Sequence, residues 1–102
     1  MKAYEKQVRK IVVDNHTFLF SVIEHPHIVK LRCYSSKTSY IEMLFNWGPL
    51  MHDLNLYRPK VVSLLIENAI QQGWDYKNGK QIYNVSVDDS ENIVKQLGLD
   101  AL

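Results

Sequence analysis

The sequence predicts one α+β domain over residues 1–102, in which an antiparallel β-meander of four to five strands packs against one main helix. Three observations support this fold class. The first half of the chain is rich in β-branched and aromatic residues between short polar segments, and the second half contains one clear amphipathic helix. A chain of 102 residues is long enough for one hydrophobic core and too short for two ordinary domains.

The four strands of the meander are predicted at residues 8–13, 17–24, 28–35 and 39–47. Their register follows from the turns, because a slip by one residue exchanges the two faces of a strand. The predicted pairs are Val13 with Phe18, Ile23 with Ile28 and Cys33 with Ile41, across loops at 15–16, 24–27 and 36–38. One face then collects the predicted core: Ile11, Val13, Phe18, Phe20, Val22, Val29, Leu31, Cys33, Ile41, Met43, Phe45 and Trp47.

The main helix is predicted in the segment PKVVSLLIENAIQQG, residues 59–73. Pro59 suits the first helical turn, and Gly73 suits a left-handed residue just past the end. The helix has an apolar stripe that is expected to close the core against the sheet: Val61, Val62, Leu65, Ile66, Ala69 and Ile70.

The end of the chain predicts a fifth strand and a short helix. Asn78-Gly79 marks a tight turn before the strand at 81–87. The helix is predicted at 89–97, with Asp88 as its N-cap and Gly98 as its stop. Its inward residues are expected to be Ile93, Val94 and Leu97.

Charge and cysteine content exclude several classes of function. Twelve Lys and Arg residues against eleven Asp and Glu give a net charge of +1, so no overall field draws the protein to nucleic acid or anionic lipid. Cys33 is the only cysteine, which excludes an internal disulfide and a multi-cysteine zinc site. No leader-like or membrane-spanning run follows Met1, and a cytoplasmic protein without membrane association is expected.

The histidines raise the question of a metal or catalytic site. His25 and His27 flank Pro26 in the predicted turn after the second strand, where a turn role is sufficient to explain them. Their convergence with His52 and Asp53 would make a small metal-dependent or histidine-based hydrolase, which is one alternative. We expect neither a metal nor a cofactor nor an enzyme, because no nucleophile elbow or phosphate-binding glycine loop is present and Cys33 is placed in the core.

The other face of the meander, which we call the outer face, is more informative. Arg32 is expected opposite Glu42 and Tyr34 opposite Tyr40. Together with Lys10 and Lys30, these residues resemble a platform for single-stranded nucleic acid, which is a second alternative. Apolar residues also fall on this face, and they predict a cover that is either the C-terminal helix or a second subunit: Val12, Leu19, Ile23, Ile28 and Leu44.

The favoured function is therefore binding. We expect a protein-protein interaction module, with a second copy of the chain as its partner, because symmetric dimers are the commonest oligomers. The predicted contact residues are Leu19, Ile23, Ile28, Lys30, Arg32 and Tyr34.

The segment RPKVVSLLIENAIQQGW, residues 58–74, resembles a type of small uncharacterised bacterial α+β protein. In those proteins a strand-rich half is followed by proline, one amphipathic helix and Gly-Trp. The resemblance implies the same fold and a bacterial protein, and no function is carried over from it. The small size and the absence of catalytic motifs, taken by themselves, would fit an accessory or immunity-like role. Trp74 itself is expected to pack on the sheet edge, with ligand stacking as the alternative.

Overall fold

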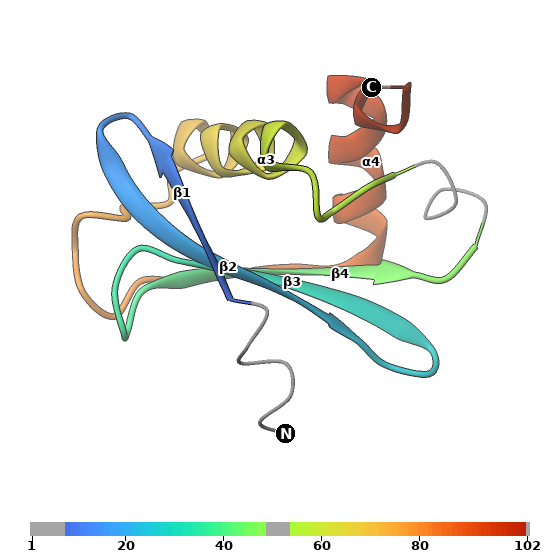
Figure 1. Ribbon diagram of the computed structural model, residues 1–102, viewed down its shortest axis with the longest axis horizontal. Helices are drawn as coiled ribbons and strands as arrows, with labels where there is room; N and C mark the ends of the chain where they lie inside the picture. The colour runs from blue at the N-terminus through green and yellow to red at the C-terminus, as the bar shows by residue number, and fades with distance from the viewer. Residues whose placement is uncertain (1–7, 49–53, 102) are drawn as a thin grey trace.

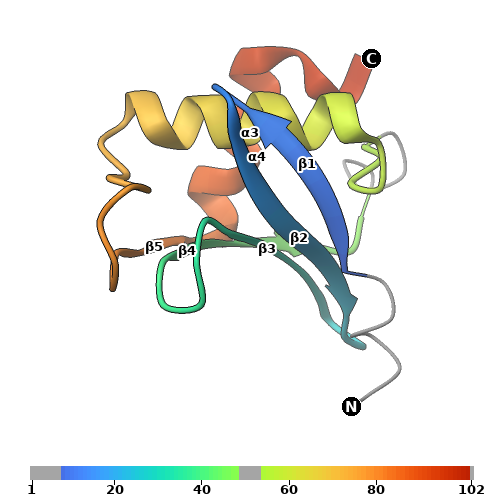
Figure 2. The same ribbon diagram turned by 60° about the vertical axis from the view of Figure 1, so that its left-hand side comes forward.

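A computed structural model describes residues 8–48 and 54–101 and contains two layers, a mixed sheet and two helices on one of its faces (Figures 1 and 2). The predicted α+β fold is confirmed. The strands are β1 (Arg9–Val13), β2 (His16–Glu24), β3 (Ile28–Tyr34), β4 (Tyr40–Asn46) and β5 (Ile82–Val85). The helices are α3 (Pro59–Gln71), α4 (Val87–Leu97) and the short 3-10 turn η1 (Leu99–Ala101).

In the part of the chain that the structure describes, the strand order is β1-β2-β3-β4-β5. The first four strands pair antiparallel, as the meander predicts. The fifth strand pairs parallel to β4, with Ile41 opposite Tyr83. The chain reaches β5 through α3, and a crossover of this kind lets a strand run in the same direction as its neighbour.

Two of the three predicted registers are wrong. Val13 pairs with His16, and Ile23 pairs with Lys30, whereas Cys33 pairs with Ile41 as predicted. The first turn lies at Asp14 and Asn15, whose φ angles are +53° and +62°. Asp and Asn tolerate the left-handed conformation that a tight hairpin turn demands, which is why this turn does not lie at Asn15 and His16.

Both errors shift the register by two residues, so the predicted inner face is unchanged. Its apolar side chains are buried under the helices, with Ile11 partly buried. Trp47 is the exception, because β4 ends at Asn46 and Trp47 lies beyond it, 46% exposed. The Trp47 Nε1–H donates to the carbonyl of His25 at 2.7 Å, which ties it to the turn between β2 and β3.

The helix α3 forms as predicted, with its apolar stripe in the core and Ile70 partly buried at its end. Gly73 has a φ of +114°, consistent with its predicted place after the helix. Trp74 is buried, so its predicted packing role is confirmed, and the Trp74 Nε1–H donates to the carbonyl of Gln81 at 3.1 Å. The same carbonyl accepts from the Tyr40 N–H and the Ser39 hydroxyl, both at 3.0 Å, which fixes the start of β5 beside β4.

The helix α4 begins two residues before the predicted start. Its N-cap is Ser86 and not Asp88, and the Ser86 hydroxyl accepts from the Asp89 N–H at 3.2 Å. Val94 is fully buried as predicted, but Leu97 is 38% exposed. Gly98 ends the helix with a φ of +66° and turns the chain so that Leu99, which is buried, fills the core in place of Leu97.

Candidate binding surface

The outer face is the surface of the sheet opposite α3 and α4. Both helices lie on the inner face, so the C-terminal helix does not cover the outer one, and that expectation is wrong (Figures 1 and 2). The pairing of β5 with β4 explains this placement. Val85 pairs with inner-face Met43 and therefore points into the core, and α4 starts directly after β5 and places Val94 in the same core.

A row of polar and aromatic side chains, which we call the polar ladder, crosses the middle of the outer face. It consists of Lys30, Arg32, Tyr34, Tyr40 and Glu42. Arg32 lies opposite Glu42 as predicted, and its Nε–H donates to the Glu42 carboxylate at 2.7 Å. The Lys30 ammonium lies 3.9 Å from the same carboxylate oxygen. Both signs of charge are therefore paired within the face, in positions that are less than one third exposed.

The aromatic side chains of the ladder are also engaged. Tyr34 and Tyr40 are cross-strand partners as predicted, and their ring centroids are 5.1 Å apart. The Arg32 guanidinium donates to the Tyr34 hydroxyl at 3.0 Å and lies 4.9 Å from the Tyr40 ring centroid. The hydrogen bond to Tyr34, followed by that to Glu42, raises the pKa of Arg32 against the effect of partial burial.

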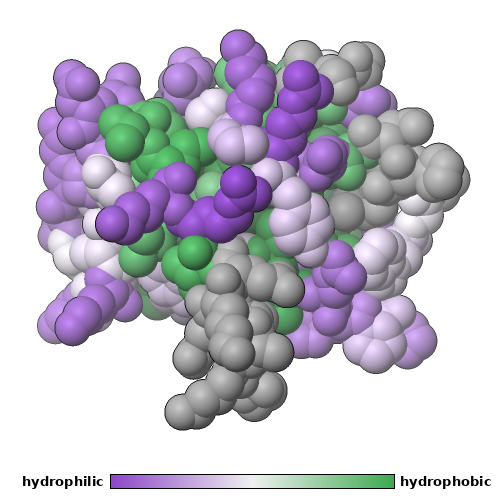
Figure 3. All heavy atoms as spheres, in the orientation of Figure 1, coloured by the Kyte–Doolittle hydropathy of each residue, from purple (hydrophilic) through white to green (hydrophobic). Residues whose placement is uncertain are grey.

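Apolar side chains lie on both sides of the ladder. Val12 and Leu19 are 65% and 40% exposed at one edge, and Ile82 is 54% exposed beside Tyr40 at the other. The space-filling view shows hydrophobic surface gathered over the β1–β2 hairpin (Figure 3). Contiguous exposed apolar residues of this kind mark surfaces that another molecule covers.

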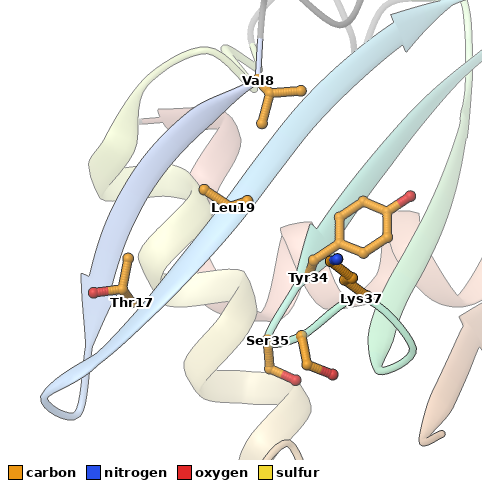
Figure 4. Close-up of a pocket in the computed structure, with 7 residues that line it drawn as sticks. Val8, Thr17, Leu19, Tyr34, Ser35 and Lys37 are labelled. Atoms are coloured by element: carbon orange, nitrogen blue, oxygen red, sulfur yellow. The ribbon is translucent and has the colours of Figure 1, made fainter. Parts of the chain in front are cut away.

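A hollow opens on the outer face between β2 and the connection from β3 to β4. It has a volume of about 610 Å³. Figure 4 shows its apolar floor, to which Leu19 on β2 and Tyr34 on β3 contribute side chains. These two residues are direct cross-strand partners. The described residues that line it are Val8, Thr17, Leu19, Tyr34, Ser35, Ser36 and Lys37.

The hollow combines an apolar floor with a polar rim. Four of the lining side chains carry hydroxyls, Thr17, Tyr34, Ser35 and Ser36, and Lys37 brings one ammonium. Such a site can accept an apolar side chain whose backbone or neighbours make hydrogen bonds at the rim. No acidic group of residues 8–48 or 54–101 lines it, so this part of the chain would also tolerate a negative charge near Lys37.

The six predicted contact residues all lie on the outer face, but the structure divides them. Leu19 and Tyr34 line the hollow. Lys30 and Arg32 belong to the ladder. Ile23 and Ile28 are partly buried at the far end of β2 and the start of β3, next to the turn. Sequence reasoning missed Thr17 and the turn residues of the hollow, although the alternation that placed Leu19 outside also places Thr17 there.

Among the histidines that the structure describes, His16 and His25 have structural contacts. The His16 ring packs edge-on against Phe18 at 4.8 Å and Tyr76 at 5.1 Å, and its Nε2 lies 3.1 Å from the Ser35 carbonyl. His25 closes the turn to β3, with its N–H donating to the Ile28 carbonyl at 2.8 Å. His16 and His25 stand at opposite ends of β2, as predicted.

The hydrolase hypothesis needs His52 and Asp53, which lie outside the described residues. Within residues 8–48 and 54–101, no three His, Cys, Asp or Glu side chains are grouped as metal ligands.

Tyr57 lies beside the end of β2, and its hydroxyl donates to the Glu24 carboxylate at 2.6 Å. Burial, and then this hydrogen bond, raise the pKa of Tyr57 to about 12.

Cys33 lies in the core as predicted. Its side chain is fully buried, and desolvation of the thiolate raises the pKa of the thiol. A thiol in this state is a small hydrophobic group and a poor nucleophile.

We expect Cys33 to resist alkylation in the native protein, because the reactive thiolate is both inaccessible and unfavourable. Mass spectrometry after iodoacetamide treatment should detect no adduct in buffer and one adduct per chain in denaturant. Rapid labelling of the native protein would contradict the buried position.

No helix in the described residues is long and apolar enough to cross a membrane. Comparison with protein-family models, with curated proteins and with solved structures finds no match to this chain.

Proposed function

We propose that this protein is a protein-binding module that associates with a second copy of itself through the outer face of its sheet. The observation that carries the proposal is the clustering of exposed apolar side chains. Of seven large hydrophobic residues that are exposed in the described chain, three lie on this face, Val12, Leu19 and Ile82, and a fourth, Val8, lines its hollow. Burial of such side chains supplies most of the free energy of association between proteins.

A second copy is favoured as the partner because the outer face has both a protruding apolar side chain and a hollow that could receive it. Val12 protrudes, and its cross-strand partner Thr17 lines the hollow beside it. In a two-fold arrangement, a residue that contacts a site on the partner receives the same contact in return. The Val12 side chain of each copy would then enter the apolar hollow of the other.

The contacts within the polar ladder favour a protein over single-stranded nucleic acid as the partner of the outer face. Lys30 and Arg32 are both paired with Glu42, so neither cation is free to neutralise a phosphate. The Tyr34 and Tyr40 rings lie against each other, and the Arg32 guanidinium covers the Tyr40 ring, which leaves less ring surface for stacked bases. A face with paired charges and an apolar edge fits a dimer interface.

The test compares two leucines of nearly equal exposure. Leu19→Lys places a charge in the proposed interface, whereas Leu97→Lys places it at the end of α4, on the other side of the molecule. We expect Leu19→Lys to weaken dimerisation by about 30-fold or more, since loss of a buried anchor costs about 2 kcal/mol. Sedimentation equilibrium of both variants and the native protein measures the dissociation constant.

Leu97→Lys is expected to keep the native dissociation constant. A monomeric native protein, or equal constants for both variants, would refute the proposed interface. Circular dichroism controls for folding, and both substitutions start from side chains that are about two fifths exposed.

A further inference from the structure

Within the described sheet, the strand β5 has a free edge on the side away from β4. The Tyr40 N–H donates to the Gln81 carbonyl at 3.0 Å, and Tyr40 pairs with Ile82 in the parallel ladder. In such a ladder, alternate residues of a strand direct their backbone groups to the same neighbour. The N–H and C=O groups of Ile82 and Asn84 therefore point away from β4, where no described strand pairs with them.

The two edges of the sheet differ in their protection. On β1, Arg9 and Lys10 supply charge, α3 packs against the strand, and the Arg9 guanidinium donates to the Tyr57 carbonyl at 3.0 Å. Charge and covering segments are the usual devices that prevent edge-to-edge pairing. The β5 sequence IYNV has neither a charged residue nor proline. Among the described residues, this edge lacks the charge and proline that discourage pairing with an extended chain, and its length of four residues limits the number of backbone pairs.

A polar groove runs beside this edge, between α3 and α4. Its volume is about 440 Å³, and β5 forms part of its wall through Tyr83, Asn84 and Val85. The groove is rich in carboxamides from the two helices, those of Asn68, Gln72, Asn92 and Gln96, and the Asp89 carboxylate lies among them. None of these five side chains makes a hydrogen bond within the described chain, so their donors and acceptors are available to a ligand.

The groove also has a charge preference. Asp89 is the one charged residue among the described residues that line it, and Asp88 precedes it in the first turn of α4. No described Lys or Arg lines the groove. A ligand with hydrogen-bonding groups and one positive charge is complementary to this surface.

We propose that β5 and this groove bind an extended segment of a partner protein by strand addition. The backbone of the segment pairs with Ile82 and Asn84, which gives affinity, and its alternate side chains give specificity. Side chains on the helix side enter the carboxamide groove and are polar, with one of them basic near Asp89. Side chains on the other side lie over exposed Ile82 and are apolar.

The probe is a capped peptide with this alternation, Val-Gln-Val-Lys-Val-Gln-Val, titrated into the full chain by calorimetry and amide NMR. We expect saturable binding, with the largest amide shifts at Ile82 and Asn84. Asn84→Pro removes an N–H that the β4–β5 ladder does not use, and edge strands tolerate proline at such positions. It should weaken binding by about tenfold or more, whereas Asn84→Ala, which keeps the N–H, should weaken it less.

Two further measurements keep the outcome decisive if a variant folds poorly. In the first, two forms of the same peptide are titrated into the native protein, one N-methylated on the backbone of its valines and the other on the backbone of its polar residues. Because alternate N–H groups of an added strand face β5, one of the two methylation patterns must abolish binding. Asp89→Asn should weaken the lysine peptide by a few fold and leave a peptide with glutamine in place of lysine unchanged.

Absence of binding at millimolar peptide would overturn the proposal, as would equal affinity for Asn84→Pro. Tight binding of a neutral trisaccharide such as chitotriose to both the native and the Asn84→Pro protein would also overturn the proposal. A glycan needs the side-chain carboxamides of the groove and not the backbone groups of the strand edge. The two proposals fail separately: Leu19→Lys leaves the β5 edge intact, and Asn84→Pro leaves Leu19 and the hollow intact.

Discussion

Replacement of Trp74 with alanine is expected to lower the free energy of unfolding by about 3–5 kcal/mol, the usual cost of truncating a large buried aromatic residue. The Trp74 ring is buried against Phe18 and Tyr76, with centroids 5.7 and 6.1 Å apart. Its Nε1–H also donates to the Gln81 carbonyl, so the variant loses packing and one hydrogen bond at the start of β5. Urea denaturation followed by circular dichroism measures the change.

Two matched variants separate the contributions of Trp74. Trp74→Phe keeps most of the aromatic surface and loses the N–H, so it should cost about 1–2 kcal/mol. Trp47→Ala removes an exposed tryptophan whose N–H also bonds to a carbonyl, and it should cost about 1 kcal/mol. If Trp74→Ala cost no more than Trp47→Ala, the packing role of Trp74 would be wrong.

Val94→Asp is expected to destabilise the domain by about 3–5 kcal/mol, because it buries an unpaired carboxylate. Val94 is fully buried where α4 packs on β4. Leu97→Asp is the control, since Leu97 lies on the same helix and is 38% exposed. Both carboxylates meet the same unfavourable end of the helix dipole, so the difference in unfolding free energy reports burial. A control as destabilised as Val94→Asp would contradict the observed orientation of α4.

The faces of the meander could be predicted from sequence because their periodicity is robust to error. Two registers were displaced, yet each by an even number of residues, so Phe18 and Leu31 stayed inside and Leu19 and Arg32 stayed outside. The main helix was equally readable, since Pro59 and Gly73 mark its ends and its apolar stripe has helical spacing. These features depend on local chemistry alone.

Other features depend on interactions that local patterns do not contain. The first turn requires positive φ at Asp14 and Asn15, a demand of the strand twist on both sides. The direction of β5 depends on the crossover through α3, and the hollow depends on the spatial separation of β2 from the β3–β4 connection. The sequence therefore predicted Leu19 and Tyr34 as contact residues without the hollow that unites them, and it did not predict the carboxamide groove.

The parallel pairing of β5 has a consequence for the order in which the domain assembles. The three hairpins of β1–β4 join neighbouring segments and close short loops, which occurs on the microsecond timescale for isolated hairpins. Pairing of β5 must wait for the long crossover to close, and such distant contacts form slowly. Until then, the nascent sheet ends at β4, and its core remains open to solvent on the side that β5 and α4 will cover. The segments β5, α4 and η1 thus complete the hydrophobic core as well as the sheet.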